Sequence, residues 1–316
     1  MIIDIADGTF KRIFNDKKFF LPLRWDNKNF EKTIETLFDD YCIAIKQNAL
    51  NNCLYNEVRG ICGLIKGAIG MYLHGFPSDA FNILEGLMER LDEEHPLIDY
   101  QKSSYSIYDR PERPDPLDLY RITIVNENIP YERSRVFHVP YTSRSKIATS
   151  RYSIAGFPSL YLGTSLELCN EEINYNPHEQ FALAAKFKLV REEFYSNIHI
   201  KVIDLAIKPQ DFIGENPEID NSYRIESTKE NHDSTTDRGR TIKPDILSAQ
   251  SVRNAYIRWY PLIAACSYIR VNKKDPFAAE YIIPQLLMQW IRHKMEKNKA
   301  EKEKNKAEKE YRKPTQ

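Results

Sequence analysis

The chain has 316 residues, in which 45 lysines and arginines balance 45 aspartates and glutamates. This balance creates no overall field that would attract nucleic acid or an anionic membrane surface, so neither is expected as a partner. No stretch approaches the roughly 18 uncharged apolar residues that a membrane-spanning helix needs. Charges interrupt the first apolar run, so the N-terminus does not resemble a signal peptide.

The cysteines and histidines argue against a metal centre. The five cysteines are odd in number, scattered and never in a CxxC pair, which favours reduced, buried thiols in a cytoplasmic protein over disulfides or zinc. The histidines are dispersed, and no HExxH pattern occurs. We therefore expect no metal cofactor.

Residues 1–110 are predicted to form a helical N-terminal domain. Apolar residues recur there at steps of three and four, which lays one apolar stripe along a helix; they are Phe30, Ile34, Leu37, Phe38, Tyr41 and Ile45. A second helix is predicted from about Glu57 to Leu73. Its interleaved glycines, Gly60, Gly63, Gly67 and Gly70, would let another helix approach closely. Gly75 stops this helix, and Pro77 starts the next. A packing and positioning role is favoured for this bundle, with partner binding as the alternative.

Residues 111–293 are predicted to form a second domain rich in β-structure. A Pro- and Asp-rich segment, residues 92–118, precedes it as a linker or surface loop. Alternation of apolar and polar residues predicts a strand at Leu119–Val125 and others near 185–189 and 198–202. The polar stretch 208–243 is predicted to be a long insertion that is flexible at least in its middle, and a lid over the site is one role open to it.

The C-terminal part combines apolar runs with a charged tail. The run from Trp259 to Ser267 is predicted as a buried strand, and Glu280–Pro284 as another strand-like step before a helix. Residues 294–316 contain KNKAEKE twice and no apolar stripe. This tail is expected to be an exposed charged helix or a disordered segment.

The stretch from Arg151 to Glu172 is the strongest candidate for a functional site. Arg151, Tyr161 and Glu172 are predicted to fall in turn on a loop, a short strand and the start of a helix capped by Thr164-Ser165. A turn can bring the three side chains around one pocket. An arginine, an aromatic ring and a carboxylate suit an anionic substrate that carries a ring.

Three further residues are candidates for substrate contacts. Arg121 lies on the predicted strand, on the face opposite Ile122 and Ile124, which are expected to form its buried face. His138 has apolar neighbours and is either a structural histidine or a substrate contact. Ser267 ends an apolar run, and a site hydroxyl and a structural role are equally open for it.

These segments resemble the RES-domain family, in its longer form with a helical N-terminal region. The resemblance rests on LYRI at Leu119–Ile122, the run from Phe137 to Gly163, YPLIAACS ending at Ser267, and EYIIPQLLMQW at Glu280–Trp290. It covers roughly Leu119 to Ile291. The N-terminal helices, the insertion and the tail depart from the short members of the family.

The resemblance implies an α+β fold, with an N-terminal helical bundle followed by an ADP-ribosyltransferase-like mixed β core and peripheral helices. It also implies a toxin that consumes NAD as its substrate, by phosphorolysis or hydrolysis, or that modifies a protein. A cognate antitoxin and a homo-oligomer are the implied protein partners. The family's arginine, tyrosine and glutamate fall on Arg151, Tyr161 and Glu172, while Glu171 beside Glu172 leaves the carboxylate open by one residue.

The residue types fit this chemistry. Cleavage of the nicotinamide–ribose bond develops positive charge on the ribose, which a carboxylate such as Glu172 can stabilise. Arg151 and Arg121 can bind the diphosphate, Tyr161 can stack on nicotinamide, and Ser267 can bond its carboxamide. Two readings stay open: an NAD-consuming enzyme, or a non-catalytic NAD-binding or regulatory module. An arginine–glutamate ion pair inside a β-fold is the structural alternative.

Overall fold

The computed structural model describes residues 7–26, 28–48, 52–92, 98–99, 118–137, 139, 141–157, 159–173, 175–176, 178–187, 202–203, 205, 249–271 and 278–311. The chain divides into two compact units, which are described separately. Unit 1 comprises Met1–Asp16, His95–Ser145 and Pro158–Ile257, and unit 2 comprises Lys17–Glu94, Lys146–Phe157 and Arg258–Gln316. The predicted insertion at 208–243 lies outside the described residues. The predicted domain limits at 110 and 293 stay a prediction.

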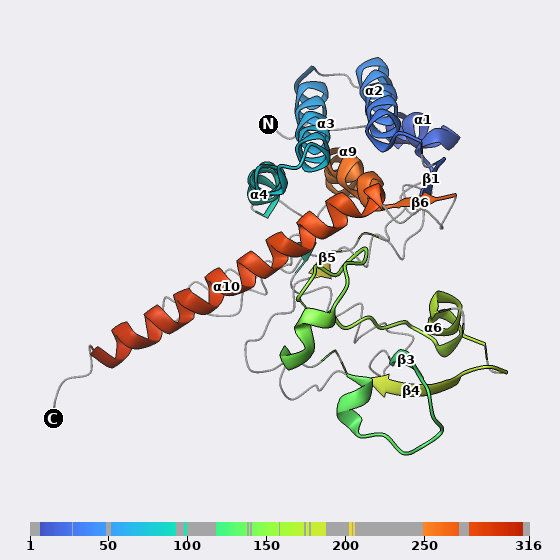
Figure 1. Cartoon of the computed structure of the whole chain (residues 1–316). Coiled ribbons are helices and arrows are strands. Elements are labelled where there is room, and N and C mark those ends of the chain that lie inside the picture. Colours follow the sequence, from blue (N-terminus) through green and yellow to red (C-terminus); the bar gives the residue numbers. More distant parts are fainter. Residues whose placement is uncertain are drawn as a thin grey trace, which may run out of the picture. The chain divides into compact units, whose positions relative to one another are not determined.

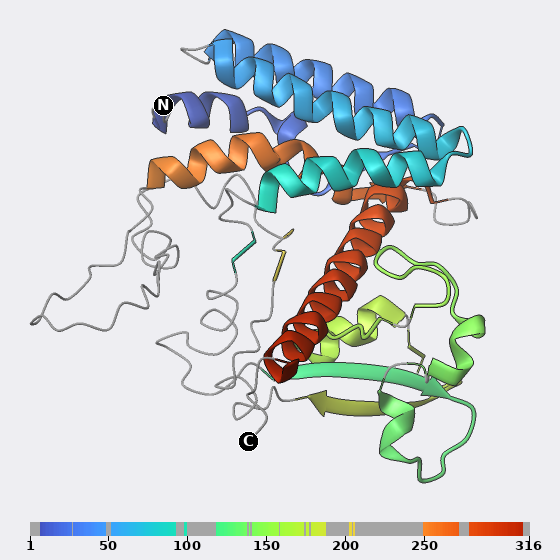
Figure 2. The ribbon, with the colours of Figure 1, turned by 90° about the vertical axis from the view of Figure 1, so that its left-hand side faces the viewer.

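Three consecutive helices form much of unit 2: α2 (Phe30–Asn48), α3 (Asn52–Leu73) and α4 (Pro77–Asp92). Figure 2 shows α2 beside α3 and α3 beside α4. The predicted stripe of α2 is confirmed, because its buried residues are Phe30, Ile34, Leu37, Phe38, Tyr41 and Ile45. The stop and restart between α3 and α4 are also confirmed, with Gly75 at a φ of 88° where a side chain would be strained.

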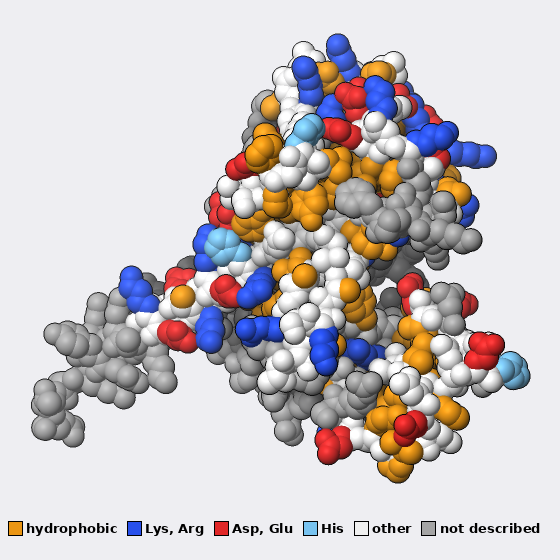
Figure 3. All heavy atoms as spheres, in the orientation of Figure 1, with side chains coloured by type: hydrophobic (Ala, Val, Ile, Leu, Met, Phe, Trp, Pro, Cys, Tyr) orange, Lys and Arg blue, Asp and Glu red, His pale blue; other side chains and the backbone are white. Residues whose placement is uncertain are grey.

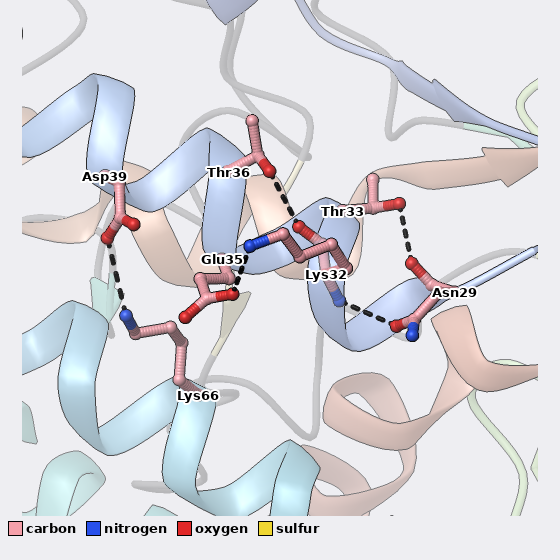
Figure 4. A network of polar contacts seen from close by, with 7 residues as sticks. All are labelled: Asn29, Lys32, Thr33, Glu35, Thr36, Asp39 and Lys66. Atoms are coloured by element: carbon pink, nitrogen blue, oxygen red, sulfur yellow. Dashed lines mark hydrogen bonds and ion pairs between the residues drawn. The ribbon is translucent and has the colours of Figure 1, made fainter.

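Polar contacts hold the start of α2 and its exposed side (Figure 4). The Asn29 side-chain oxygen accepts a hydrogen bond from the Lys32 backbone N–H at 2.8 Å, which caps the helix. Lys32 pairs with Glu35 at 2.9 Å, and Lys66 of α3 pairs with Asp39 of α2 at 3.5 Å. These exposed pairs contribute little individually, so the apolar stripe supplies most of the packing energy.

The glycines of α3 do not all serve close packing. A Cβ at Gly67 would meet Ile83 of α4 at 3.9 Å, and one at Gly70 would meet Glu31 of α2 at 3.2 Å. A Cβ at Gly60 or Gly63 would meet no atom within 4 Å. The prediction that glycine allows close helix approach is therefore confirmed at Gly70, where the contact would be tight, and is wrong at Gly60 and Gly63.

The apolar run at Trp259 to Cys266 is helical, which corrects the predicted strand. It is the last part of α9 (Ala249–Cys266), a helix that begins in unit 1 and whose residues from Arg258 on belong to unit 2. Trp259 to Cys266 are all buried. A helix that is buried on every side shows no amphipathic period, so its sequence resembles that of a buried strand.

Unit 2 ends in a short sheet and a long helix. β1 (Leu23–Trp25) pairs in parallel with β6 (Tyr268–Arg270). The 3-10 helix η5 (Ala279–Tyr281) leads into α10 (Ile282–Tyr311), so the strand predicted at Glu280–Pro284 is wrong. Figure 1 shows α10 as one long helix, and its residues from Met295 to Glu301 are exposed. The predicted exposed charged helix is thus confirmed for the described part of the tail.

Unit 1 contains α1 (Asp7–Phe14), α6 (Leu166–Ile173) and the first part of α9. Phe10 and Phe14 of α1 contact the Tyr256 ring, with centroids 6.1 and 5.5 Å away. Two antiparallel pairs complete the described unit: β3 (Leu119–Val125) with β4 (Phe181–Phe187), and β2 (Ile98–Asp99) with β5 (Val202–Ile203). Figure 2 shows β3 and β4 side by side.

The described chain is therefore α+β and mostly helical, with N-terminal helices and small two-stranded sheets. The predicted ADP-ribosyltransferase-like core stays a prediction. No described helix combines the length and the apolar composition needed to cross a membrane. No disulfide joins the five cysteines, of which only Cys62 and Cys266 are buried.

Candidate functional site

The two units divide the candidate residues between them. Arg121, Tyr161 and Glu172 belong to unit 1, whereas Arg151 and Ser267 belong to unit 2. His138 lies outside the described residues. Within unit 2 the structure brings Arg151 next to Ser267, and within unit 1 it links the segment of Tyr161 to the strand of Arg121. One pocket that includes all five residues stays a prediction.

A tight turn presents Arg151. Ser150 and Ser153 pair with each other through backbone hydrogen bonds of 3.0 and 3.3 Å, with Arg151 and Tyr152 between them. The side-chain amide of Gln285 in α10 donates to the Ser150 backbone oxygen at 3.1 Å. This long-range bond anchors the turn, so the position of Arg151 depends on a residue far along the chain.

The guanidinium of Arg151 binds the backbone on both sides of Ser267. It donates to the Cys266 oxygen at 3.2 Å and to the Tyr268 oxygen at 2.7 Å. Cys266 ends α9, and a cation at a helix C-terminus is favourable because the last carbonyls carry partial negative charge. Arg151 therefore has a structural role at this junction. Its fork has five N–H donors, so the two observed bonds leave donor capacity for a ligand.

The Ser267 hydroxyl is engaged with its own helix. It donates to the Ile263 oxygen at 2.6 Å, and the Ser267 backbone N–H bonds to Ala264 at 3.0 Å. These bonds favour the structural interpretation of this serine. The hydroxyl oxygen keeps its acceptor capacity, so it can still accept a bond from the amide of a ligand.

Three residues that sequence reasoning did not assign surround Arg151. The Arg151 guanidinium lies 5.2 Å from the centroid of the Tyr281 ring, and that of Arg270 lies 5.7 Å from the same ring. Arg270 pairs with Glu280, Nε to Oε1, at 2.5 Å. We call Arg151, Arg270, Glu280 and Tyr281 the arginine cluster. Each guanidinium lies within the range of a cation–π contact.

Glu280 is an unusual member of this cluster. It is 2% exposed, and its second oxygen, Oε2, has no hydrogen-bond partner among the described residues. Burial raises the pKa of Glu280, while its own backbone N–H, Arg270 and Arg151 act in the opposite direction. A buried carboxylate of this kind is costly unless it is paired, so the ion pair with Arg270 is what makes its charged form tolerable.

In unit 1, a pair of backbone hydrogen bonds fixes the segment of Tyr161 beside β3. Tyr120 and Gly163 exchange N–H to oxygen bonds of 2.8 Å in both directions. The Cys169 thiol of α6 donates to the Tyr120 oxygen at 3.2 Å. A Cβ at Gly163 would lie 2.6 Å from the Cys169 sulfur. Glycine is therefore required at 163 for α6 to pack against this bridge.

The helix that carries Glu172 begins as the sequence predicts. The Ser165 hydroxyl accepts a hydrogen bond from the Leu168 backbone N–H at 3.1 Å, which confirms it as the N-cap of α6. Glu171 and Glu172 are both exposed on this helix. Tyr161 is 46% exposed. The short apolar run around Tyr161 forms no strand, since its described neighbours make only the single bridge at Gly163.

Arg121 is half-buried on β3, opposite Ala185 of β4. Its Nη1 has no hydrogen-bond partner among the described residues, nor has the hydroxyl of Thr123, two residues on. Burial lowers the pKa of Arg121. Side chains at i and i+2 lie on the same face of a strand, so this face holds two buried polar groups. The predicted burial of the other face is wrong at Ile124, which is 37% exposed.

Each unit offers its own chemistry. Unit 2 supplies guanidinium donors and a hydroxyl acceptor, which suit phosphate oxygens and an amide. Unit 1 supplies an exposed ring, an exposed carboxylate and a further arginine. Among the described residues, no three His, Cys, Asp or Glu side chains gather as metal ligands would. The EYIIPQ motif, which contains Glu280, Tyr281 and Gln285, could have indicated these three residues from the sequence. No local pattern indicates Arg270.

Comparisons with known proteins give one informative relationship. The chain is 27% identical over 277 residues to the putative toxin YopC of Bacillus subtilis (strain 168). The match covers 85% of this chain and 54% of that protein, so the chain spans about half the length of the relative. No family model matches the chain, and no solved structure matches it. Membership of the RES-domain family stays a prediction.

Proposed function

We propose that the protein is a toxin that consumes NAD by cleaving the bond between nicotinamide and ribose. The observation that carries the proposal is the arginine, tyrosine and glutamate series at Arg151, Tyr161 and Glu172, in a chain related to a protein described as a putative toxin. The exposure of Tyr161 and Glu172 supports the proposal, since both side chains are accessible to a ligand.

Each residue has a defined role in the proposed reaction. Arg151 binds the diphosphate through charge-assisted hydrogen bonds, and Tyr161 stacks on the nicotinamide ring. Glu172 stabilises the positive charge that develops on the ribose as the bond breaks, as carboxylates do in glycoside cleavage. The Ser267 oxygen accepts a bond from the carboxamide N–H. The electrons of the broken bond return to the ring nitrogen, and nicotinamide leaves as a neutral pyridine, so neither a metal nor a nucleophilic triad is needed.

The acceptor of the ADP-ribosyl group decides the reaction class. Attack by phosphate releases ADP-ribose phosphate, attack by water releases ADP-ribose, and attack by a side chain modifies a protein. We favour phosphate or water, and propose transfer to a protein as the alternative. The alternative that is not an enzyme is a module that binds NAD without converting it.

One assay separates these reactions. The purified protein is incubated with NAD, with and without inorganic phosphate, and the products are identified by mass spectrometry. Loss of NAD that requires phosphate establishes phosphorolysis. Loss without phosphate establishes hydrolysis if free ADP-ribose is the product, and transfer if the protein gains the ADP-ribosyl group. If NAD stays intact but still binds the folded protein, NAD consumption is refuted and a protein target or a binding module takes its place.

A further inference from the structure

Two cysteines of unit 2 meet across the contact between two helices, Cys42 of α2 and Cys62 of α3. A hydrogen bond joins their side chains. Cys62 is buried and Cys42 is half-buried, so the pair lies at the edge of the helix interface. The proposed cleavage of NAD uses neither thiol.

The other contacts between α2 and α3 show that the two helices run antiparallel. Glu31, at the start of α2, lies next to Gly70, near the end of α3, where an added Cβ would meet its carboxylate at 3.2 Å. Further along α2, Asp39 pairs at 3.5 Å with Lys66, which precedes Gly70 in α3 (Figure 4). A step forward along α2 therefore matches a step back along α3.

This register places the two cysteines opposite each other. Cys42 comes three residues after Asp39, and Cys62 comes four residues before Lys66. Each step is about one helical turn, so the cysteines occupy the next facing positions after the ion pair. Side chains in hydrogen-bond contact are already near the separation that a disulfide needs.

The hydrogen bond gives the two thiols different reactivity. It lowers the pKa of Cys42, because it stabilises the thiolate. Burial and Asp39 oppose this shift, whereas Lys66 and Arg59 add to it. The same bond, together with burial, raises the pKa of Cys62. Since the thiolate is the nucleophile, Cys42 is the thiol that reacts first.

We propose that Cys42 and Cys62 form a redox-sensitive pair, which a peroxide converts reversibly into a disulfide that fastens α2 to α3. The structure shows the reduced form of this pair. No candidate residue of the proposed reaction lies in α2 or α3, so the proposal goes beyond NAD cleavage and does not depend on it.

The oxidation takes place in two steps. The Cys42 sulfur attacks one oxygen of hydrogen peroxide, the O–O bond breaks, and the second oxygen takes up a proton and leaves as water, so that Cys42 becomes a sulfenic acid. The Cys62 sulfur then attacks the Cys42 sulfur, and the hydroxide that departs combines with the Cys62 proton to form a second water. The two sulfurs lose two electrons, which the peroxide gains. A small thiol reverses the reaction by exchange.

The test maps the oxidised thiols in the full chain. The protein is reduced, freed of reductant and treated with a small molar excess of hydrogen peroxide. The remaining thiols are blocked with N-ethylmaleimide, and unreduced peptides are identified by mass spectrometry. We expect the peptide that contains Cys42 to be joined to the peptide that contains Cys62, within a single chain. Dithiothreitol should restore both thiols.

Three variants assign the roles of the cysteines. In Cys62→Ser, Cys42 should accumulate as a sulfenic acid that dimedone traps. In Cys42→Ser, Cys62 should stay reduced under the same conditions, because it is buried. Cys53→Ser is the control: it removes an exposed thiol of α3 and should leave the Cys42–Cys62 link unchanged. Circular dichroism checks that each variant folds.

Thermal unfolding tests whether the disulfide fastens the two helices. The bond closes a loop of about 20 residues, which should raise the Tm of the oxidised wild type by about 5 °C or more. Dithiothreitol should abolish the rise, and Cys42→Ser should not show it. An unchanged or lower Tm of the cross-linked protein would refute the fastening of α2 to α3.

Two results of the mapping would overturn the proposal. One is the oxidation of Cys53 or Cys266 while Cys42 and Cys62 stay reduced. The other is a Cys42–Cys62 link that forms only after unfolding in urea, since the native arrangement of α2 and α3 would then not bring the thiols together. Both measurements are independent of whether the protein consumes NAD.

Discussion

Arg151 and Tyr268 are separated by 117 residues, yet Nη2 of the arginine donates to the backbone oxygen of the tyrosine at 2.7 Å. A second bond reaches the oxygen of Cys266, so one side chain spans the junction between α9 and β6. The residue that we propose to bind the diphosphate thus also holds the backbone around Ser267. Loss of activity on substitution of Arg151 will therefore combine two effects.

Substitution of Arg151 should lower stability as well as activity. Arg151→Met removes two charge-assisted bonds to backbone oxygens, and we expect the free energy of unfolding to fall by about 2 kcal/mol. Arg292→Met, which removes an exposed ion pair, should change it by less than about 0.5 kcal/mol. Urea unfolding monitored by circular dichroism measures both. Equal values for the two variants would contradict a structural role for Arg151.

Substitution of Tyr161 should separate stacking from hydrogen bonding. Tyr161→Phe keeps the ring, so the KM for NAD should stay within about twofold of the wild type, whereas Tyr161→Ala should raise it about tenfold or more. Because Tyr161 is 46% exposed, both variants should keep wild-type stability. A large effect of the phenylalanine variant on KM would show that the hydroxyl, not the ring, binds the substrate.

The ionisation of Glu280 should oppose folding as pH rises. Burial raises the pKa of Glu280 above its ordinary value of 4.5, so the folded state holds this proton more tightly than the unfolded chain does. The resulting contribution to stability is complete below the unfolded pKa and is lost as pH rises through the folded pKa. The side chain in Glu280→Gln does not ionise, so the stability of this variant lacks the contribution of Glu280 to the pH dependence.

The stability of the wild type relative to Glu280→Gln should therefore decrease as pH rises from about 4 to 7. Urea unfolding of both proteins across this range gives the difference, in which the titration of other groups largely cancels. A difference that grows in favour of the wild type would mean that the pKa of Glu280 is lowered, with Arg270 outweighing burial.

The thiols should differ in reactivity according to their burial. Burial raises the pKa of Cys266 to about 12, so only about one thiol in ten thousand is ionised at pH 8. Cys53 is exposed. We expect iodoacetamide to modify Cys53 readily in the folded protein and Cys266 only after unfolding, as followed by peptide mass spectrometry. Rapid modification of Cys266 under native conditions would contradict its complete burial.

The sequence predicts those features that depend on residues close together along the chain. The stripe from Phe30 to Ile45 has the helical period, and Ser165 stands where a cap for α6 is needed, so both predictions are confirmed. The run Trp259–Cys266 is apolar throughout and carries no period. Its prediction as a strand failed because burial on all sides removes the signal that distinguishes a helix from a strand.

The long-range contacts of the candidate site could not be predicted in this way. Gln285 bonds to Ser150 and Arg151 bonds to Cys266, and each pair is more than a hundred residues apart. No spacing in the sequence records such pairs. Glu280 and Tyr281 lie in a motif that the resemblance singled out, but their roles become visible only when Arg270 and Arg151 are placed around the ring.

Beyond Ile291, α10 carries basic and acidic side chains on its surface (Figure 3), which form pairs such as Arg292–Glu296 and Lys299–Glu303. Pairs at a spacing of four residues stabilise an isolated helix. This explains why a tail without an apolar stripe is helical, and it matches the first of the two forms expected from its composition.

The central claim is that Glu172 stabilises the developing ribosyl cation. The most direct test compares a substitution of Glu172 with the same substitution of its neighbour Glu171. Both Glu171 and Glu172 are exposed on α6, so Glu171→Gln is a matched control for charge and helix position. We predict that Glu172→Gln lowers kcat for NAD loss by about a hundredfold or more, while Glu171→Gln stays within about twofold of the wild type and both variants remain folded. Equal rates for Glu172→Gln and the wild type would contradict the account.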